Sequence, residues 1–238
     1  MFAAYLLQTL LLIEVFSMQA DMLSTLTAVP LFAHIPQSEL VKLAAIARQE
    51  KFSKNAEIMA EGDQTSGLYI LLSGKVKVML RNEEGKEIIL AILNPPEYFG
   101  EMALMDEAPR SADIVAMAPT TVLLIAKHEF KLWLERQPDM AFVIIKTLAQ
   151  RLREADRKIG DLALMDVYGR VARALIGLAK EDDQGRMVVS DNLSQQSLAD
   201  MVGASREMVS RTLKDLAQVG HIWFDGKDII VNQHAQRV

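Results

Sequence analysis

The segment from Ser194 to Lys214 reads SQQSLADMVGASREMVSRTLK, and it decides the fold of the C-terminal part of the chain. Ser194 and Ser205 each stand where a serine hydroxyl caps the first turn of a helix. Gly203, between them, supplies the left-handed residue that a tight turn requires. After Ser205 the apolar residues keep a helical spacing and form one stripe: Val209, Leu213 and Leu216. The segment therefore predicts two short helices joined by a turn, a helix-turn-helix.

The residues that follow the two predicted helices have the pattern of a β-hairpin. Two short apolar runs, 221–224 and 228–231, flank the sequence Asp225-Gly226-Lys227. An Asp-Gly pair between apolar runs is a strong hairpin signal. Two helices followed by a hairpin predict a winged helix-turn-helix.

The face of the second predicted helix opposite its apolar stripe is polar. In a helix-turn-helix, the N-terminal residues of this helix reach base edges in the major groove of DNA. Arginine pairs with guanine and glutamate accepts from the cytosine amino group, so this face fits a G·C-rich half-site. The alternative is a surface ion pair between Glu207 and Arg211, which are four residues apart. We predict DNA contacts at Gln196, Ser205, Arg206, Glu207, Ser210, Arg211 and Lys214.

The first half of the chain has a different pattern. After a short helical stretch over 30–49, apolar runs of four to seven residues alternate with turn signals from Phe52 to Ile125. Many short strands separated by regular turns are typical of a sandwich, barrel or roll. The clearest predicted strands are 68–72, 76–80, 88–93 and 121–125.

The segment 99–112, FGEMALMDEAPRSA, places a glycine, a carboxylate, an arginine and a hydroxyl close together. Gly100 allows close approach of the backbone, Glu101 can accept from a ribose hydroxyl, and Arg110 with Ser111 can hold a phosphate. The alternative is a structural Glu101–Arg110 salt bridge. The predicted ligand site comprises Gly100, Glu101, Met102, Ala103, Arg110, Ser111 and Ala112.

From Pro138 the apolar residues recur at alternating spacings of four and three for about six turns, which is the seam of a coiled coil. We predict a long helix that pairs with a second copy of the chain; the alternative is an amphipathic helix packed on its own domain. The seam residues are Ala141, Ile145, Leu148, Leu152, Ala155, Ile159 and Leu162.

Composition excludes several kinds of site. The chain has 238 residues, a formal net charge of −5, no cysteine and four histidines. Without cysteine there is no disulfide and no Cys-ligated iron–sulfur cluster, and the histidines lack the spacing of metal ligands. We predict no metal. Because the net charge is negative, binding to DNA requires a local basic patch.

The N-terminal segment from Met1 to Phe16 is largely apolar but reaches Glu14 before it is long enough to span a membrane. It also lacks the basic start and cleavage site of a signal peptide. We expect an extra N-terminal helix, or translation from Met18 or Met22, and in both cases a cytoplasmic protein without a membrane anchor.

The pattern from Gln196 to Lys214, with Leu198, Gly203 and Ser205-Arg206-Glu207, resembles the helix-turn-helix of the cyclic-AMP receptor protein (CRP/FNR) family of bacterial transcription regulators. The similarity extends over about 31–231 and includes the phosphate segment. It implies a homodimer that binds a palindromic, TGTGA-like DNA site and contacts RNA polymerase, controlled by a cyclic nucleotide.

These observations predict an α+β fold in four parts. Residues 1–28 form an N-terminal extension, and 29–137 a jelly-roll-like, cyclic-nucleotide-binding β-roll. Residues 138–165 form the dimerisation helix, and 166–238 the winged helix-turn-helix.

The sequence leaves the identity of the ligand open. In cyclic-AMP-responsive members of the family a threonine and a serine on the long helix contact the purine, whereas this chain has Ala155 and Asp156 there. Asp156 can accept from a purine amino group, so cyclic AMP, another cyclic mononucleotide, cyclic di-GMP and ligand-independent binding remain alternatives. An enzyme using Glu101, Asp106 and Glu107 would lack a nucleophile and a second convergent site, so we expect no catalysis.

Overall fold

The computed structural model describes residues 22–33, 35–64, 67–190 and 193–232. The chain forms two compact units. The first comprises Met1–Val78 and Ile92–Gln150, and the second comprises Met79–Ala91 and Arg151–Val238. The N-terminal helix predicted over 1–16 lies outside the described residues, and residues 22–28 form a helix.

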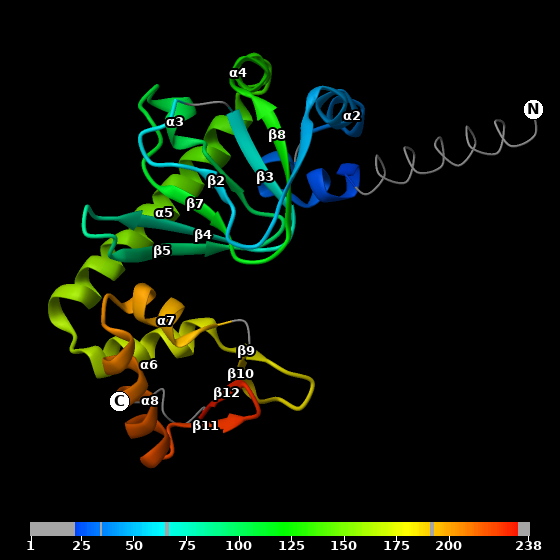
Figure 1. Ribbon diagram of the computed structural model, residues 1–238. Coiled ribbons are helices and arrows are strands. Elements are labelled where there is room, and N and C mark those ends of the chain that lie inside the picture. The colour runs from blue at the N-terminus through cyan, green and yellow to red at the C-terminus, as the bar shows by residue number, and fades with distance from the viewer. Residues whose placement is uncertain (1–21, 34, 65–66, 191–192, 233–238) are drawn as a thin grey trace, which may run out of the picture. The chain divides into compact units, whose positions relative to one another are not determined.

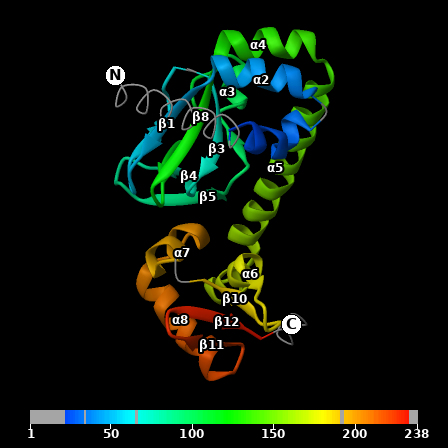
Figure 2. The ribbon, with the colours of Figure 1, turned by 90° about the vertical axis from the view of Figure 1, so that its right-hand side faces the viewer.

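Eight strands build two four-stranded sheets, which carry the N-terminal roll (Figures 1 and 2). Their orders are β1-β8-β3-β6 and β2-β7-β4-β5. The strands are β1 (Arg48–Phe52), β2 (Glu57–Met59), β3 (Gly67–Ser73), β4 (Val76–Arg81), β5 (Glu87–Leu93), β6 (Tyr98–Phe99), β7 (Asp113–Ala116) and β8 (Thr120–Ala126). All four strands predicted most clearly from the sequence are present, as β3, β4, β5 and β8.

The core of the first unit forms where strands β3 and β8 meet the helices. The two strands pair antiparallel, with Leu68 opposite Ile125 and Ile70 opposite Leu123, and all four side chains are fully buried. They share one apolar cluster with side chains of η1 (Pro30–Phe32), α2 (Gln37–Ile46), α4 (Lys127–Arg136) and the first turns of α5 (Asp139–Leu164). The cluster includes Leu104 from the segment that carries Arg110.

Helix α5 confirms the predicted long helix and contributes residues to both units. Its 26 residues span about 39 Å at 1.5 Å per residue. Met140 and Ile144 in its first turns are buried in the first unit. Farther along, Leu152 and Ile159 are 63% and 64% exposed, so the predicted seam is not covered by the chain itself at these positions.

The second unit contains the predicted winged helix-turn-helix. Its elements after α5 are α6 (Val167–Leu178), β9 (Lys180–Glu181), β10 (Met187–Val189), α7 (Gln195–Val202), α8 (Arg206–Gln218), β11 (Ile222–Asp225) and β12 (Asp228–Val231). The four strands form one sheet in the order β11-β12-β10-β9. Val171 and Leu175 of α6 join Val209, Leu213 and Leu216 of α8 in a single buried cluster.

Gly203 has the backbone conformation that the turn between α7 and α8 requires. Its φ is +62°, in the left-handed region, and a Cβ there would lie 3.0 Å from Cδ2 of Leu162. An L-residue in this region costs about 1–2 kcal/mol. The glycine is therefore required by backbone geometry.

We expect Gly203→Ala to lower the free energy of unfolding of the second unit by about 1–2 kcal/mol. Gly177→Ala is the matched control, because Gly177 lies in α6 with open space where a Cβ would stand, and alanine in a helix is favoured over glycine by roughly 0.5–1 kcal/mol. Amide hydrogen exchange in α8 measures both changes. Shifts of the same sign would contradict this account.

Candidate functional site

Arg110 is anchored by its backbone beside a tight turn. Its N–H donates to the carbonyl of Asp63 at 2.9 Å, and its own carbonyl accepts from the N–H of Gly62 at 2.8 Å. Gly62 has a φ of +84°, which glycine adopts without steric cost. The 62–63 turn thus fixes where the arginine side chain begins.

The guanidinium of Arg110 is buried and aligned by backbone carbonyls. Only 4% of the residue is exposed. Nη1 donates to the carbonyl of Gly100 at 2.7 Å and Nη2 to that of Gly67 at 2.9 Å. Cζ lies 5.8 Å from the centroid of the Tyr69 ring, which stacks on Phe99. Two carbonyls and an aromatic face therefore surround the cation.

Burial lowers the pKa of Arg110, and this effect is opposed by interactions with Tyr69, Glu101 and Asp63. Glu101 is itself fully buried. The sequence left open a structural Glu101–Arg110 salt bridge. Two hydrogen bonds of the guanidinium, at 2.7 and 2.9 Å, go to carbonyls, and the charge of Glu101 raises the pKa of Arg110, so this alternative stays open. The carbonyls of Gly67 and Gly100 therefore orient the guanidinium, and the charges of Glu101 and Asp63 act on it as well.

Gly100 is required by both backbone and space. Its φ is +85°, and a Cβ would lie 2.5 Å from Nη1 of Arg110 and 3.2 Å from the carbonyl oxygen of Gly67. Any larger residue would displace the guanidinium. In the structure the close neighbour of Gly100 is the Arg110 side chain, and the approach of a ligand to the Gly100 backbone stays a prediction.

The other predicted ligand residues separate into a buried and an exposed group. Ala103 and Ala112 are buried, whereas Met102 is 45% exposed at the start of α3 (Met102–Met105). The hydroxyl of Ser111 is exposed and donates to Sδ of Met102 at 3.9 Å. The structure thus places Gly100 against the Arg110 side chain and Ser111 against Met102.

Asp156, the remaining predicted ligand residue, belongs to the second unit. It lies on the part of α5 that belongs to the second unit, and it is exposed, as is Ala155. The structure does not bring either residue into one unit with Arg110.

Sequence reasoning missed the backbone partners of Arg110 at Gly67 and its neighbour Tyr69. A carbonyl oxygen belongs to every residue, so the acceptor role of Gly67 left no signal. It also missed Asp113, which is 7% exposed and whose carboxylate accepts from the N–H of Glu61 at 2.8 Å. An acidic residue directly after the Arg-Ser-Ala motif is the signal that was available for Asp113.

Both predicted serine caps are present in the helix-turn-helix. Ser194 Oγ accepts from the N–H of Ser197 at 3.0 Å at the start of α7. Ser205 Oγ accepts from the N–H of Met208 at 3.2 Å at the start of α8. Figure 1 shows α8 following α7 along the chain, and Gly203 is the left-handed residue that ends α7. The first turn of the predicted reading helix is therefore fixed by its cap.

The predicted DNA contacts lie mainly on the exposed side of α8. Arg206, Glu207, Arg211 and Lys214 are exposed, and Ser210 is half-buried. On α7, Gln196 Nε2 donates to Oδ1 of Asp200 at 2.8 Å. The structure, which describes both residues, contains no ion pair between Glu207 and Arg211, so the alternative drawn from their spacing is not favoured.

Glu207 is held in its ionised form. Its own backbone N–H lowers the pKa of the carboxyl most, followed by the Ser205 hydroxyl and the charge of Arg206. An ionised glutamate only accepts hydrogen bonds, which is the state that accepts from a cytosine amino group.

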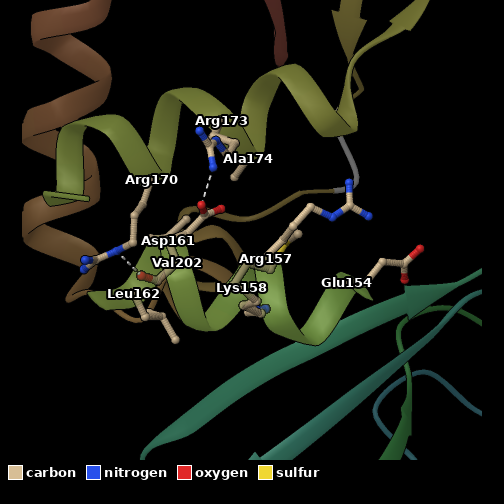
Figure 3. Close-up of a pocket in the computed structure, with 10 residues that line it drawn as sticks. Glu154, Arg157, Lys158, Asp161, Leu162, Arg170, Arg173, Ala174 and Val202 are labelled. Carbon is tan, nitrogen blue, oxygen red and sulfur yellow. Dashed lines mark hydrogen bonds and ion pairs between the residues drawn. The ribbon is translucent and has the colours of Figure 1, made fainter. Parts of the chain in front are cut away.

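The junction of α5, α6 and α7 is held by polar contacts of two arginines (Figure 3). Arg170 Nε donates to the carbonyl of Val202 and its Nη1 to that of Met165, both at 2.8 Å. Arg173 on α6 pairs with Asp161 on α5. We call these contacts the elbow. They bind the start of the winged helix-turn-helix to the end of the long helix.

A cavity of about 270 Å³ lies at the elbow, entirely within the second unit. Near it, the Lys158 ammonium donates to the carbonyl of Ile89 in β5, and burial lowers the pKa of that amine. The cavity is lined by Glu154, Arg157, Lys158, Asp161, Leu162, Arg170, Arg173, Ala174, Met201 and Val202.

Comparison with known proteins identifies both units. The cyclic nucleotide-binding domain family matches residues 49–137, and the Crp-like helix-turn-helix domain family matches 169–236. A CRP-like cAMP-activated global transcriptional regulator of Mycobacterium tuberculosis is 31% identical over 205 residues, which cover 85% of this chain and 92% of the relative. The chain belongs to the CRP/FNR family of transcription regulators.

Two further relatives show the range of ligands in this family. The cAMP-activated global transcriptional regulator CRP of Salmonella typhimurium is 34% identical, over 76% of this chain and 88% of the relative. The solved structure of the c-di-GMP responsive global regulator CLP of Xanthomonas campestris is 25% identical with a TM-score of 0.69, over 79% of this chain and 94% of that one. The predicted family and the α+β fold class are confirmed.

Two kinds of feature are absent from the described residues. No helix among them is long and apolar enough to cross a membrane. No group of three or more histidine, aspartate or glutamate side chains in the described ranges is arranged to hold a metal ion.

We expect Ser205→Ala to destabilise α8 by about 1 kcal/mol, the usual cost of losing a serine cap, and to raise the pKa of Glu207 toward its ordinary value because one of its donors is lost. Carboxyl NMR titration and hydrogen exchange measure the two effects. Ser194→Ala is the control: it removes an equivalent cap from α7 and should leave the Glu207 titration unchanged. An unchanged Glu207 pKa in Ser205→Ala would show that the hydroxyl does not act on it.

Proposed function

We propose that this CRP/FNR-family regulator binds a cyclic nucleotide at Arg110 and that the bound ligand controls DNA binding by α8. The observation that carries this proposal is the buried, carbonyl-aligned guanidinium of Arg110 beside Gly100. A charge-assisted bond from arginine to phosphate is stronger than one to a neutral carbonyl. A phosphate entering beside Gly100 therefore competes well with the two carbonyls.

In this proposal the residues of the 100–112 segment have distinct roles. Arg110 and the Ser111 hydroxyl hold the phosphate, and Glu101 accepts from a ribose hydroxyl. Gly100 leaves room for the guanidinium, and Met102, Ala103 and Ala112 form the wall of the site. The named relatives activated by cAMP support a cyclic mononucleotide as ligand.

Cyclic di-GMP is the second candidate ligand, for two reasons. Ala155 and Asp156 replace the two hydroxyl residues that contact the purine in cyclic-AMP-responsive members. In addition, the similar structure from Xanthomonas campestris is that of a c-di-GMP responsive regulator. A carboxylate at Asp156 accepts from the amino group of guanine as well as that of adenine. DNA binding without any ligand is the third candidate.

We expect isothermal titration calorimetry of the full chain to show binding of one among cyclic AMP, cyclic GMP and cyclic di-GMP. Arg110→Ala should weaken this binding about 100-fold or more, because hydrogen bonds to charged groups contribute roughly 1.5–3 kcal/mol each. Arg110→Lys keeps the charge but loses the fork and should give an intermediate affinity.

Arg136→Ala, which removes an exposed arginine from α4 of the same unit, is the matched control and should leave binding unchanged. Thermal melting verifies that each variant is folded. Equal nucleotide affinity in Arg110→Ala and wild type would refute the site, and absence of binding to all three nucleotides would favour the ligand-independent regulator.

We propose that the protein is a homodimer paired through α5. Ile145, Leu152 and Ile159 on this helix are 61%, 63% and 64% exposed, and exposed apolar residues at coiled-coil spacing are stabilised by pairing with a second helix. A two-fold dimer presents two α8 helices, which then require half-sites about one DNA turn apart. The two-fold symmetry supports a palindromic site. The family resemblance implies that this site is TGTGA-like and that the protein contacts RNA polymerase.

We expect Leu152→Glu and Ile159→Glu each to convert the dimer to monomer in sedimentation velocity, because each places a charge in the apolar seam. Leu132→Glu in α4, at a residue 43% exposed and outside α5, should leave the dimer intact. Dimers in all three variants at micromolar protein would exclude α5 as the pairing surface.

The proposed control is a shift between two arrangements of the dimer. Ligand binding in the first unit changes the packing of α5, which continues into the second unit and ends at the elbow. The contacts of Arg170 and Arg173 then transmit this change to α6 and α7. A ligand shifts such an equilibrium only as far as it binds one arrangement more tightly than the other.

We propose that the β-roll spans residues 29–137, the dimerisation helix 138–165 and the winged helix-turn-helix 166–238.

A further inference from the structure

Met208 is the residue in the first turn of α8 that the predicted DNA contacts do not explain. It lies directly after Arg206 and Glu207, yet its side chain has no charge and no hydrogen-bond donor. It is 46% exposed, whereas its neighbour Val209 is fully buried. The side chain is therefore not part of the core of the second unit.

The position of Met208 on the helix is well defined. Its N–H is the donor to the Ser205 cap at 3.2 Å, which fixes the backbone at this turn. Residues three apart on a helix lie on the same side, so Met208 and Arg211 share one flank of α8. Because Arg211 is exposed, that flank of the reading helix is open to DNA.

Among the groups at the edges of base pairs in the major groove, one matches an apolar side chain. The C5 methyl of thymine offers apolar contact, whereas the other groups of the groove are hydrogen-bond donors and acceptors. Methionine is unbranched and polarisable and adapts its shape to such a contact. Arg206, Glu207 and Arg211 are predicted to contact G·C pairs. Recognition of an A·T pair therefore requires a different side chain.

We propose that Met208 reads a thymine by apolar contact with its C5 methyl group and so helps to determine the sequence specificity of this regulator. The assignment rests on DNA reading by α8. Exchange of thymine for uracil removes this methyl and leaves the base's hydrogen-bonding groups unchanged, so it isolates the proposed contact.

The test starts from a DNA duplex that the full-length protein selects from a random pool, with the nucleotide that gives the tightest binding or with none. Each thymine is then replaced by deoxyuridine, one per half-site at a time, and affinity is measured by fluorescence anisotropy. For the wild-type protein, the replacement at one thymine position should lower the affinity for DNA about fourfold per half-site, which is the effect of one buried methyl group.

Three variants isolate the contribution of Met208. Met208→Ala should bind the thymine and deoxyuridine duplexes equally at that position, because the contact is absent. Met208→Leu should keep the difference, because leucine is apolar and of similar volume. Leu132→Ala removes an apolar side chain that is 43% exposed in α4 of the first unit, outside the 100–112 segment, and should behave as wild type. Thermal melting confirms that each variant is folded.

Two results would overturn the assignment: no thymine whose replacement weakens wild-type binding, or a penalty that persists in Met208→Ala. If the wild-type protein selects no sequence at all, DNA reading by α8 is itself wrong and the assignment fails with it. That failure is distinct from loss of the methyl effect alone, because in the latter case specific binding remains.

Discussion

The enclosure of the Arg110 guanidinium is the interaction on which the ligand-binding unit depends. An arginine stays charged under physiological conditions, and a buried charge is costly unless polar groups surround it. In this chain, the carbonyls of Gly67 and Gly100 accept from the guanidinium, and the 62–63 turn fixes the arginine backbone. The glycine at 100 is a consequence, because a Cβ there would collide with Nη1. The same arrangement orients the guanidinium for the phosphate that we propose it binds.

The second unit depends on backbone constraints at the ends of short helices. Gly203 allows the turn, and Ser205 caps the helix that follows. Only with these ends fixed does the buried stripe of α8 face α6 and leave Arg206 and Arg211 exposed. The elbow contacts of Arg170 then connect α6 to the carbonyl of Val202 at the end of α7. The orientation of the reading helix and the packing of the long helix are thereby linked through a few hydrogen bonds.

The sequence was sufficient for those features that local chemistry determines. Helix α5, the two serine caps, the glycine turn and the wing hairpin all follow from periodicity and turn residues, and the structure contains each of them. It was insufficient for short strands: β1 has mostly polar residues and β6 has two residues, so neither shows a pattern of its own. It was also insufficient for the partners of Arg110, because a backbone carbonyl leaves no trace in the residue type and Gly67 is 43 positions away. The roles of Asp156 and of the other site residues stay predictions.

The central claim is that ligand occupancy at Arg110 controls DNA binding by α8. It is tested most directly by measuring the affinity of the full-length protein for its selected DNA duplex at fixed salt, with and without saturating nucleotide. We predict at least a tenfold increase in affinity on nucleotide addition for the wild-type protein and none for Arg110→Ala. Equal affinity in the wild-type protein with and without any of the three nucleotides would contradict the account.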